Sequence, residues 1–302
     1  MAEVVTTVFG RDIQRNIYPD NAFYKGARKD AGVDVNATTI EIPQAGVKPT
    51  VVKNPSVFPL TIEKITGDKK SYTLDLLATL PTHIEDLEAA LVSYDKRAEI
   101  LMDHQLYLEE NIAAAIALAW APPASSAATN IIRTTGADKT ATAPGATGNR
   151  KKITLADFIK AFTAFNNWNI PQAGRRVVMT GNMFADLLQI PEFQSWDKMG
   201  RVVLPTGSLG QILGFDIYVR SILPSYSTAL APKAIGATGA TTDNELALFF
   251  HPSYVRYAEG NVKVYMEVDK PQYLGSLMNA AVRTGGVVPR ADLKGVLALV
   301  EA

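Results

Sequence analysis

Residues 82–120 read THIEDLEAAL VSYDKRAEIL MDHQLYLEEN IAAAIALAW, and this stretch decides the fold that the sequence predicts. Its apolar residues recur at alternating spacings of three and four, which is typical of a helix with one buried face. The repeating positions are Ile84, Leu87, Leu91, Tyr94, Ala98, Leu101, Leu108, Ile112, Ala115 and Ala119, with polar Gln105 as the one interruption. We therefore expect a single helix that buries one face along its whole length.

Both ends of this helix carry signals of their own. Thr82 and Glu85 fit a capping box, in which a hydroxyl and a carboxylate accept hydrogen bonds from the free N–H groups of the first turn. Pro122 and Pro123 end the helix. At a rise of ~1.5 Å per residue the rod would span about 55 Å, which is long for a compact domain of this size. The subunit should be elongated, with this helix either in a coiled coil between two copies or, as its context favours, along a sheet as a spine.

The composition excludes several classes of protein. Hydrophobic residues make up 47% of the 302 residues, which is enough to bury a core, and Lys plus Arg equals Asp plus Glu at 30 each. This balance argues against tight wrapping of nucleic acid. The absence of cysteine excludes disulfides and thiolate chemistry. The first residues lack a secretory signal and no apolar run is long enough for a membrane, so we expect a protein made in the cytoplasm.

Strands are predicted ahead of the long helix. Residues 1–35 mix glycine, proline and basic residues without any period, which suggests an extended arm. From residue 36 apolar and polar residues alternate, at 39–42, 60–63 and 72–76, with turn residues between these runs. The pattern predicts a long two-stranded projection with charged edges. Because an isolated hairpin is only marginally stable in water, the projection should rest on a neighbouring subunit.

The part of the chain after the helix mixes helices and strands, so the fold class is α+β. Two segments rich in Ala, Thr and Gly, 121–149 and 231–243, are expected to be surface loops on one continuous fold rather than linkers. Thr154 and Asp157 should cap a helix, and a second helix is expected at 183–188. The predicted strands cover 175–179, 215–219, 246–250, 262–268 and 295–300.

No catalytic or ligand-binding motif stands out. His83, His104 and His251 do not have a metal-ligand spacing, and no Gly-x-Ser-x-Gly elbow is present. The glycine-containing segments 145–152 and 236–239 depart from the phosphate-loop and dinucleotide patterns. We therefore expect no enzyme activity, no cofactor and no metal site.

Three segments resemble the major capsid proteins of tailed double-stranded DNA bacteriophages, whose fold is shared with herpesvirus capsids and encapsulins. They are GSLGQILGFDIYVRSILP (207–224), FFHPSYV (249–255) and RTGGVVPRAD (283–292). The order of elements resembles that family over nearly the whole chain. The resemblance implies an N-terminal arm at 1–35, an extended β-hairpin loop at 36–81, a peripheral domain at 82–173 with the spine helix 82–120, an axial domain at 174–250 and a return to the peripheral domain at 251–302.

The same resemblance implies a structural protein that self-assembles into the hexamers and pentamers of an icosahedral virion shell around double-stranded DNA. It further implies assembly in the host cytoplasm, a separate scaffolding protein, a portal, a possible decoration protein and weak, non-specific contact with the packaged DNA. Basic residues on the arm, the projection and the loops are the candidates for contacts between subunits: Arg11, Arg15, Lys48, Lys53, Lys64, Lys69, Lys70, Arg201 and Arg290.

Three alternatives remain open. An encapsulin-like nanocompartment shell would share the fold and enclose cargo proteins instead of DNA. A tail-tube or filament protein would assemble into open tubes, because a head-to-tail contact need not close. An enzyme whose site is assembled from residues far apart in the sequence is the third.

Overall fold

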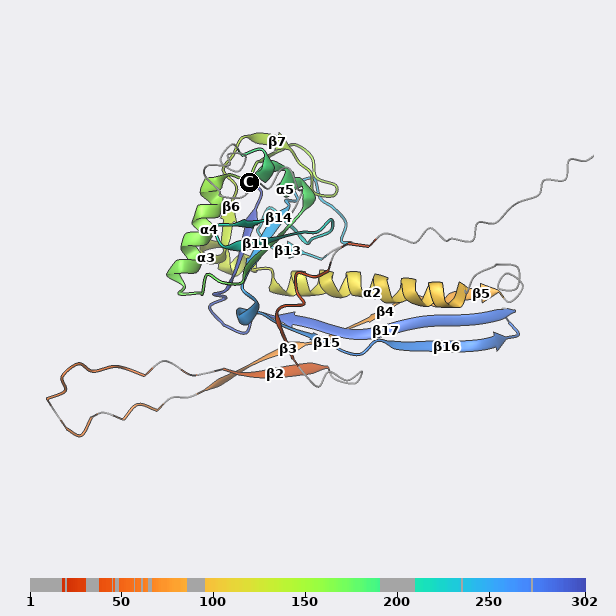
Figure 1. The fold of residues 1–302 in the computed structure, drawn as a ribbon, viewed down its shortest axis with the longest axis horizontal. Helices are drawn as coiled ribbons and strands as arrows, with labels where there is room; N and C mark the ends of the chain where they lie inside the picture. Colours follow the sequence, from red (N-terminus) through yellow and green to blue (C-terminus); the bar gives the residue numbers. More distant parts are fainter. Residues whose placement is uncertain are drawn as a thin grey trace, which may run out of the picture.

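A computed structural model describes residues 18–19, 21–30, 38–44, 46, 49–56, 58–60, 62–64, 67–85, 96–190, 210–234, 236–272 and 274–302. Two sheets and one long helix make up its frame (Figure 1). The helix α2 (Lys96–Trp120) lies along the first sheet, and the second sheet sits at one end of it (Figure 1). The described part of the subunit is therefore elongated.

The first sheet is built around one long strand, β17 (Gly275–Val287). Along one edge β17 pairs antiparallel with β15 (Arg256–Glu259) and β16 (Lys263–Lys270), and it also pairs with β4 (Asp75–Ala78) and β5 (Thr82–Glu85). A short strand, β1 (Arg28–Lys29), adds parallel to β15. Because every longer strand of this sheet pairs with β17, that strand holds the sheet together.

The second sheet has the order β10-β11-β9-β14-β18-β6 and mixes parallel and antiparallel pairs. Its strands are β10 (Gln211–Ile212), β11 (Phe215–Val219), β9 (Arg175–Met179), β14 (Leu246–Phe250), β18 (Val296–Val300) and β6 (Ile131–Arg133). β14 and β18 are apolar and buried at every position. Runs of this kind belong to strands that are covered on both faces.

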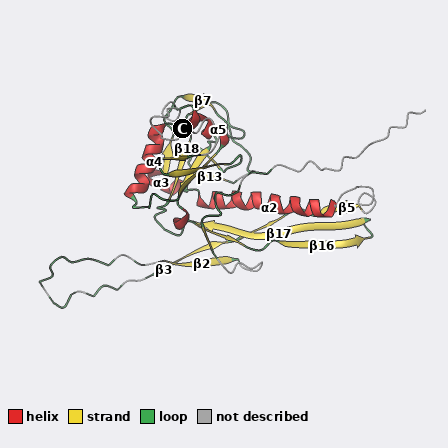
Figure 2. Ribbon diagram, viewed as in Figure 1, coloured by secondary structure: helices red, strands yellow, loops and turns green. Residues whose placement is uncertain are grey.

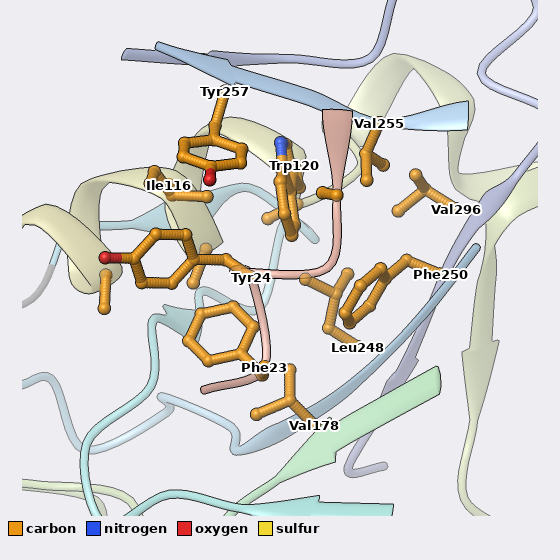
Figure 3. Packing of buried hydrophobic residues seen from close by; sticks show 14 of the residues in the cluster. Phe23, Tyr24, Ile116, Trp120, Val178, Leu248, Phe250, Val255, Tyr257 and Val296 are labelled. Atoms are coloured by element: carbon orange, nitrogen blue, oxygen red, sulfur yellow. The ribbon is translucent and has the colours of Figure 1, made fainter. Parts of the chain in front are cut away.

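Alternate residues of these strands enter two different cores. Ala247 and Phe249 pack with α4 (Leu155–Asn167) and α5 (Gly181–Leu188) in one core. Leu248 and Phe250 face the other core, which also contains side chains of α2 and of the first sheet (Figure 3). The second core therefore joins the two sheets.

Short elements complete the described part of the chain. The hairpins are β2 (Thr39–Gln44) with β3 (Asp68–Thr73), β7 (Asp138–Thr140) with β8 (Asn149–Lys151), and β12 (Ser225–Tyr226) with β13 (Pro232–Lys233). The short helices are η1 (Ala124–Ser126), α3 (Ala127–Asn130) and η2 (Pro252–Tyr254).

The two Ala/Thr/Gly loops contact each other. Thr147 N–H donates to the carbonyl of Thr241 at 3.0 Å, and the Arg150 guanidinium donates to the carbonyls of Thr241 and Asp243, both at 3.1 Å. These bonds agree with segments of one fold rather than linkers, but the expected surface loop at 121–149 is wrong in part, because it contains α3 and strand β6, which pairs with β18 in the second sheet.

The expected start of the long helix is wrong. Thr82–Glu85 forms strand β5 and pairs with 275–278 of β17, so Thr82 and Glu85 do not make a capping box. Helical structure is described from Lys96, while 86–95 lie outside the described residues. The alternation Thr-His-Ile-Glu also fits a strand, and the available edge of β17 decides between the two patterns.

The buried face of the helix also differs from the predicted one near its C-terminal end. Leu108, Ile112, Ile116 and Trp120 are buried at intervals of four, whereas Ala119 is exposed. The larger side chains bury more apolar area than alanine does, so they set the orientation of the helix. The packing of α2 on a sheet of its own subunit agrees with a spine rather than a coiled coil.

Two further differences concern strands. Residues 60 and 62–63 are not in a strand, since they have no strand partner among the described residues. β17, the central strand of the first sheet, was not predicted as a strand, because Gly275, Gly285 and Gly286 lower its apparent propensity.

The predicted strand at 72–76 is divided between β3 and β4, which pair with β2 and β17 respectively, whereas the strands and helices predicted after the long helix are confirmed in place. Strands cover Arg175–Met179, Phe215–Val219 and Leu246–Phe250, and the helix at Leu155–Asn167 has the predicted capping box between Thr154 and Asp157. β6 and β18 belong to the second sheet although they lie outside 174–250, so strand pairing joins segments that the expected domain division separates.

Candidate inter-subunit surface

The root of the β2–β3 hairpin is anchored on the first sheet. Ile42, Tyr72 and Leu74 form a small core with Ala258 and Val287. This core fixes the base of the hairpin against β15 and β17.

Beyond these strands the chain continues into what we call the hairpin tip, the described residues between 49 and 64. Every one of them is exposed, and the tip extends away from both sheets (Figure 1, Figure 2). Thr50 N–H donates to the Glu63 carboxylate at 3.0 Å, which links its two arms. The exposed fraction is 94% for Ile62 and 72% for Phe58, and Val51, Val52 and Leu60 are exposed as well. Apolar side chains gathered on a projection mark a surface for another protein.

A second apolar surface lies on β16, the edge strand of the first sheet. Its side chains Val264, Tyr265, Met266 and Val268 are all more than a third exposed. A groove of about 670 Å³ runs beside them between Pro81 and Asn279. We call these four residues with the groove the β16 surface.

The predicted basic contact residues have different surroundings. Lys53 and Lys64 are exposed on the hairpin tip. Lys69 pairs with Glu41 across the hairpin at 2.8 Å. Lys70 donates to the carbonyl of Val288 at 2.9 Å, and burial lowers the pKa of its ammonium. Lys70 is thus used within the subunit, at the hairpin root.

The remaining candidates are dispersed. Arg290 makes two hydrogen bonds to Asp292, at 2.8 and 2.7 Å, and this pairing holds the pKa of Asp292 down at about 2. Arg11, Arg15, Lys48 and Arg201 lie outside the described residues. The structure therefore places Lys53 and Lys64, but not Lys70 or Arg290, beside the apolar tip.

The apolar tip residues themselves were not predicted as contact residues. Their signal was present in the alternation at 60–63, which was interpreted as a strand. An alternating apolar face on a projection without a core is better interpreted as a face for a partner.

The histidines are structural where they are buried. The His104 ring lies 3.0 Å from the Thr82 hydroxyl, and burial lowers the pKa of His104. His251 Nδ1 accepts from Ser253 N–H, which leaves Nε2 to donate to the carbonyl of Ala173, and burial lowers the pKa of His251.

Within the described ranges, no three His, Asp or Glu side chains are placed to hold a metal ion. No single helix of the described chain is both long and apolar enough to cross a membrane.

Comparison with known proteins identifies the family of this chain. The sequence model for the phage capsid protein family matches residues 26–297. No functionally curated protein matches the chain in sequence.

Solved phage capsids have the same fold. The capsid structure of the cyanophage P-SCSP1u is 19% identical with a TM-score of 0.70, over 98% of this chain and 92% of that one. The acidic stable capsid of Helicobacter pylori bacteriophage KHP30 is 13% identical with a TM-score of 0.68, over 98% and 95%. Mycobacterium phage Che8 matches at 17% identity and a TM-score of 0.62, over 99% and 98%.

Proposed function

This chain belongs to the phage capsid protein family, and we propose that its copies form hexamers and pentamers that close into an icosahedral shell around double-stranded DNA. The exposed apolar hairpin tip carries the proposal, because it has no partner surface in its own subunit among the described residues. Its role is structural, and we propose no catalytic activity. The family match favours a phage capsid shell over an encapsulin-like compartment or a tail tube.

The β16 surface of a neighbouring copy is the proposed seat of the hairpin tip. Both surfaces are apolar, and bringing them together removes apolar side chains from water, at about 25 cal/mol for each Å² buried. Tip and β16 surface are different parts of one chain, so the contact is head-to-tail, and such contacts close into rings when the rotation permits. Lys53 and Lys64 would border this contact, and Arg11, Arg15, Lys48, Lys69, Lys70, Arg201 and Arg290 stay candidates for others.

Further partners belong to the same proposal. The chain carries 30 basic and 30 acidic residues, so contact with packaged DNA should be weak and non-specific. A separate scaffolding protein and a portal would take part in assembly in the host cytoplasm, and a decoration protein could bind the finished shell. The proposed division is an arm at 1–35, an extended loop at 36–81, a peripheral domain at 82–173 and 251–302, and an axial domain at 174–250.

Substitution of Ile62 tests the proposal. Ile62→Asp places a charge in the proposed apolar contact, and we expect closed shells to be lost from electron micrographs and sedimentation profiles. Because the Ile62 side chain is 94% exposed in the subunit, the midpoint of thermal unfolding of the unassembled variant should equal that of the natural chain. Ile62→Leu keeps the apolar character and serves as the matched control, which should assemble.

Other outcomes are equally clear. Shells formed by Ile62→Asp as readily as by the natural chain would refute the role of the tip. A natural chain that stays monomeric at high concentration would refute the shell, and open tubes would support the filament alternative. Shells that never package DNA in the presence of the phage proteins would support the compartment.

A further inference from the structure

Residues 21–30 contact helix α2, both sheets and the root of the β2–β3 hairpin, and we call them the keystone segment. The sequence predicted an extended arm here, but Phe23 and Tyr24 are each only 1% exposed. The Phe23 ring lies 6.2 Å from the ring of Trp120 in α2 and 6.3 Å from that of Phe250 in the second sheet (Figure 3). The Tyr24 ring lies 5.2 Å from Tyr257 in the first sheet. The two aromatic rings thus fill the space in which helix and both sheets meet.

Two arginines bond the segment to the second sheet: buried Arg220, which directly follows β11, and partly buried Arg176 in β9. Arg220, 1% exposed, donates through Nε to the Asn21 side chain at 3.3 Å and through Nη2 to the carbonyl of Glu110 in α2 at 2.9 Å. Arg176 in β9 donates to the carbonyl of Phe23 at 3.0 Å. A buried guanidinium is costly unless its donors are used, and all three nitrogens of Arg220 donate, the third to the carbonyl of Ile222, so its bonds are held in one geometry.

The other end of the segment holds the hairpin root. β1 pairs with β15, and the Asp30 carboxylate accepts from Arg256 at 3.1 Å and from the Tyr72 hydroxyl at 2.8 Å. Tyr72 belongs to β3, the strand that leads from the hairpin tip into the sheet. One carboxylate therefore links the segment, the first sheet and the hairpin.

We propose that the keystone segment is a positioning element, which sets the angle between the two sheets through Phe23 and the direction of the hairpin through Asp30. A pull on the chain N-terminal to it would then be transmitted to both, because the same ten residues are bonded to each part. Packed interfaces of this kind change between discrete arrangements rather than deforming continuously. This coupling between the angle of the two sheets and the direction of the hairpin is a property of the single subunit, so it does not depend on shell formation.

The absence of cysteine allows a direct test in the unassembled full-length subunit. Spin labels on cysteines at the exposed positions Asn167 and Gln272 report the distance between the two sheets, and labels at Gln272 and Lys53 report the direction of the hairpin. We expect one narrow distance distribution for each pair in the natural chain. Phe23→Ala, or the milder Phe23→Leu if the first does not fold, should broaden or shift the distance between the sheets.

Three further variants separate positioning from simple loss of stability. Phe165→Ala removes a fully buried ring from the core under α4, so a comparable loss of stability should leave the distances between labels unchanged. Asp30→Asn should alter the hairpin distance and leave the sheet distance as it was. Tyr24→Phe should change neither, because the Tyr24 hydroxyl has no hydrogen-bond partner among the described residues.

The expected and contrary results are distinct. Altered distances in Phe23→Leu but not in an equally destabilised Phe165→Ala would support the proposal. Unchanged distances in both Phe23→Leu and Asp30→Asn would overturn it, whether or not the subunits assemble. Failure of shell formation with the distances as expected would count only against the proposed function.

Discussion

The ammonium of Lys139 is shared by two buried carboxylates. Its ammonium lies 2.5 Å from Asp186 and 2.6 Å from Glu301, and the backbone N–H of Glu245 donates to Glu301 at 3.2 Å. Burial would lower the pKa of Lys139, but its hydrogen bonds to the two carboxylates raise it overall. Burial, and the charge of Glu245, raise the pKa of Glu301, which outweighs the opposite effect of Lys139. A carboxylate buried among others is the first to take up a proton.

Replacement of Glu301 should flatten the dependence of stability on pH. Because the pKa of Glu301 is higher in the folded than in the unfolded chain, its contribution is fully present below the unfolded value of 4.5 and is lost as pH rises through the folded value. Within that window the natural chain should lose about 1.4 kcal/mol for each pH unit relative to Glu301→Gln. Urea unfolding at several pH values between 4 and 8 measures the difference.

An exposed carboxylate provides the control for this measurement. Asp138 pairs with Lys151 at 3.6 Å with 66% of its side chain exposed, so Asp138→Asn should follow the natural chain at every pH. A difference between Glu301→Gln and the natural chain that stays constant or grows in favour of the natural chain as pH rises would contradict the assignment.

At the scale of elements, the first sheet depends on close approaches to β17. A Cβ on Gly286 would lie 3.1 Å from the Cβ of Ala119 and 3.2 Å from the indole nitrogen of Trp120, so α2 rests almost directly on the strand. A Cβ on Gly275 would overlap the backbone carbonyl of Ile84 in β5. Glycine, which is a poor strand residue by propensity, is required here by packing.

Gly275→Ala should therefore destabilise the subunit. The overlap is with backbone rather than with a flexible side chain, so β5 has to move, at a cost of about 1–3 kcal/mol. Gly181→Ala is the control, because a Cβ at that position meets no atom within 4 Å and lies in the first turn of α5. Thermal unfolding should show a lower midpoint for the first variant and an equal or higher one for the second. An equal midpoint for Gly275→Ala would show that β5 does not pack as described.

At the scale of the whole molecule, one core binds the two sheets into a single unit. Phe250 and Leu248 of the second sheet pack with Tyr257 of the first and with Trp120 of the helix between them (Figure 3). The indole of Trp120 also donates to the carbonyl of Arg256 at 2.9 Å. Neither sheet can lose its partner without exposing this core, so unfolding should be cooperative across the subunit.

Single-tryptophan variants can follow the two cores separately. Trp168→Phe with Trp196→Phe leaves Trp120 in the core between the sheets, and Trp120→Phe with Trp196→Phe leaves Trp168 beside the core under α4. In dilute, unassembled protein each fluorescence curve should coincide with circular dichroism of the same variant in urea. Separate transitions within one variant would show that the two sheets unfold independently.

Shell formation follows from what one subunit leaves exposed. The hairpin tip and the β16 surface are both apolar and both lie outside the cores. Because the tip extends away from both sheets, it does not reach the β16 surface of its own copy (Figure 1). The elongated frame separates them, which supports our proposal that each is covered by a second copy.

The sequence by itself determined the elements whose pattern is local. The capping box of Thr154 and Asp157, the continuous apolar run of β14 and the long periodicity ending at Trp120 each depend on residues close together in the chain. It also supplied the order of elements that resembles phage capsid proteins. Local hydrogen bonding and apolar burial suffice to specify such features.

Only the tertiary structure decided the conformation and burial of segments that depend on contacts distant in the sequence. Thr82–Glu85 is a strand because β17 offers an edge, Phe23 is buried because helix and sheets leave space for its ring, and Lys70 is turned inward by the carbonyl of Val288. The apolar tip is exposed for the converse reason, since no part of the described subunit covers it. Each outcome depends on contacts between residues far apart in the chain, whose distance the order of amino acids alone does not state.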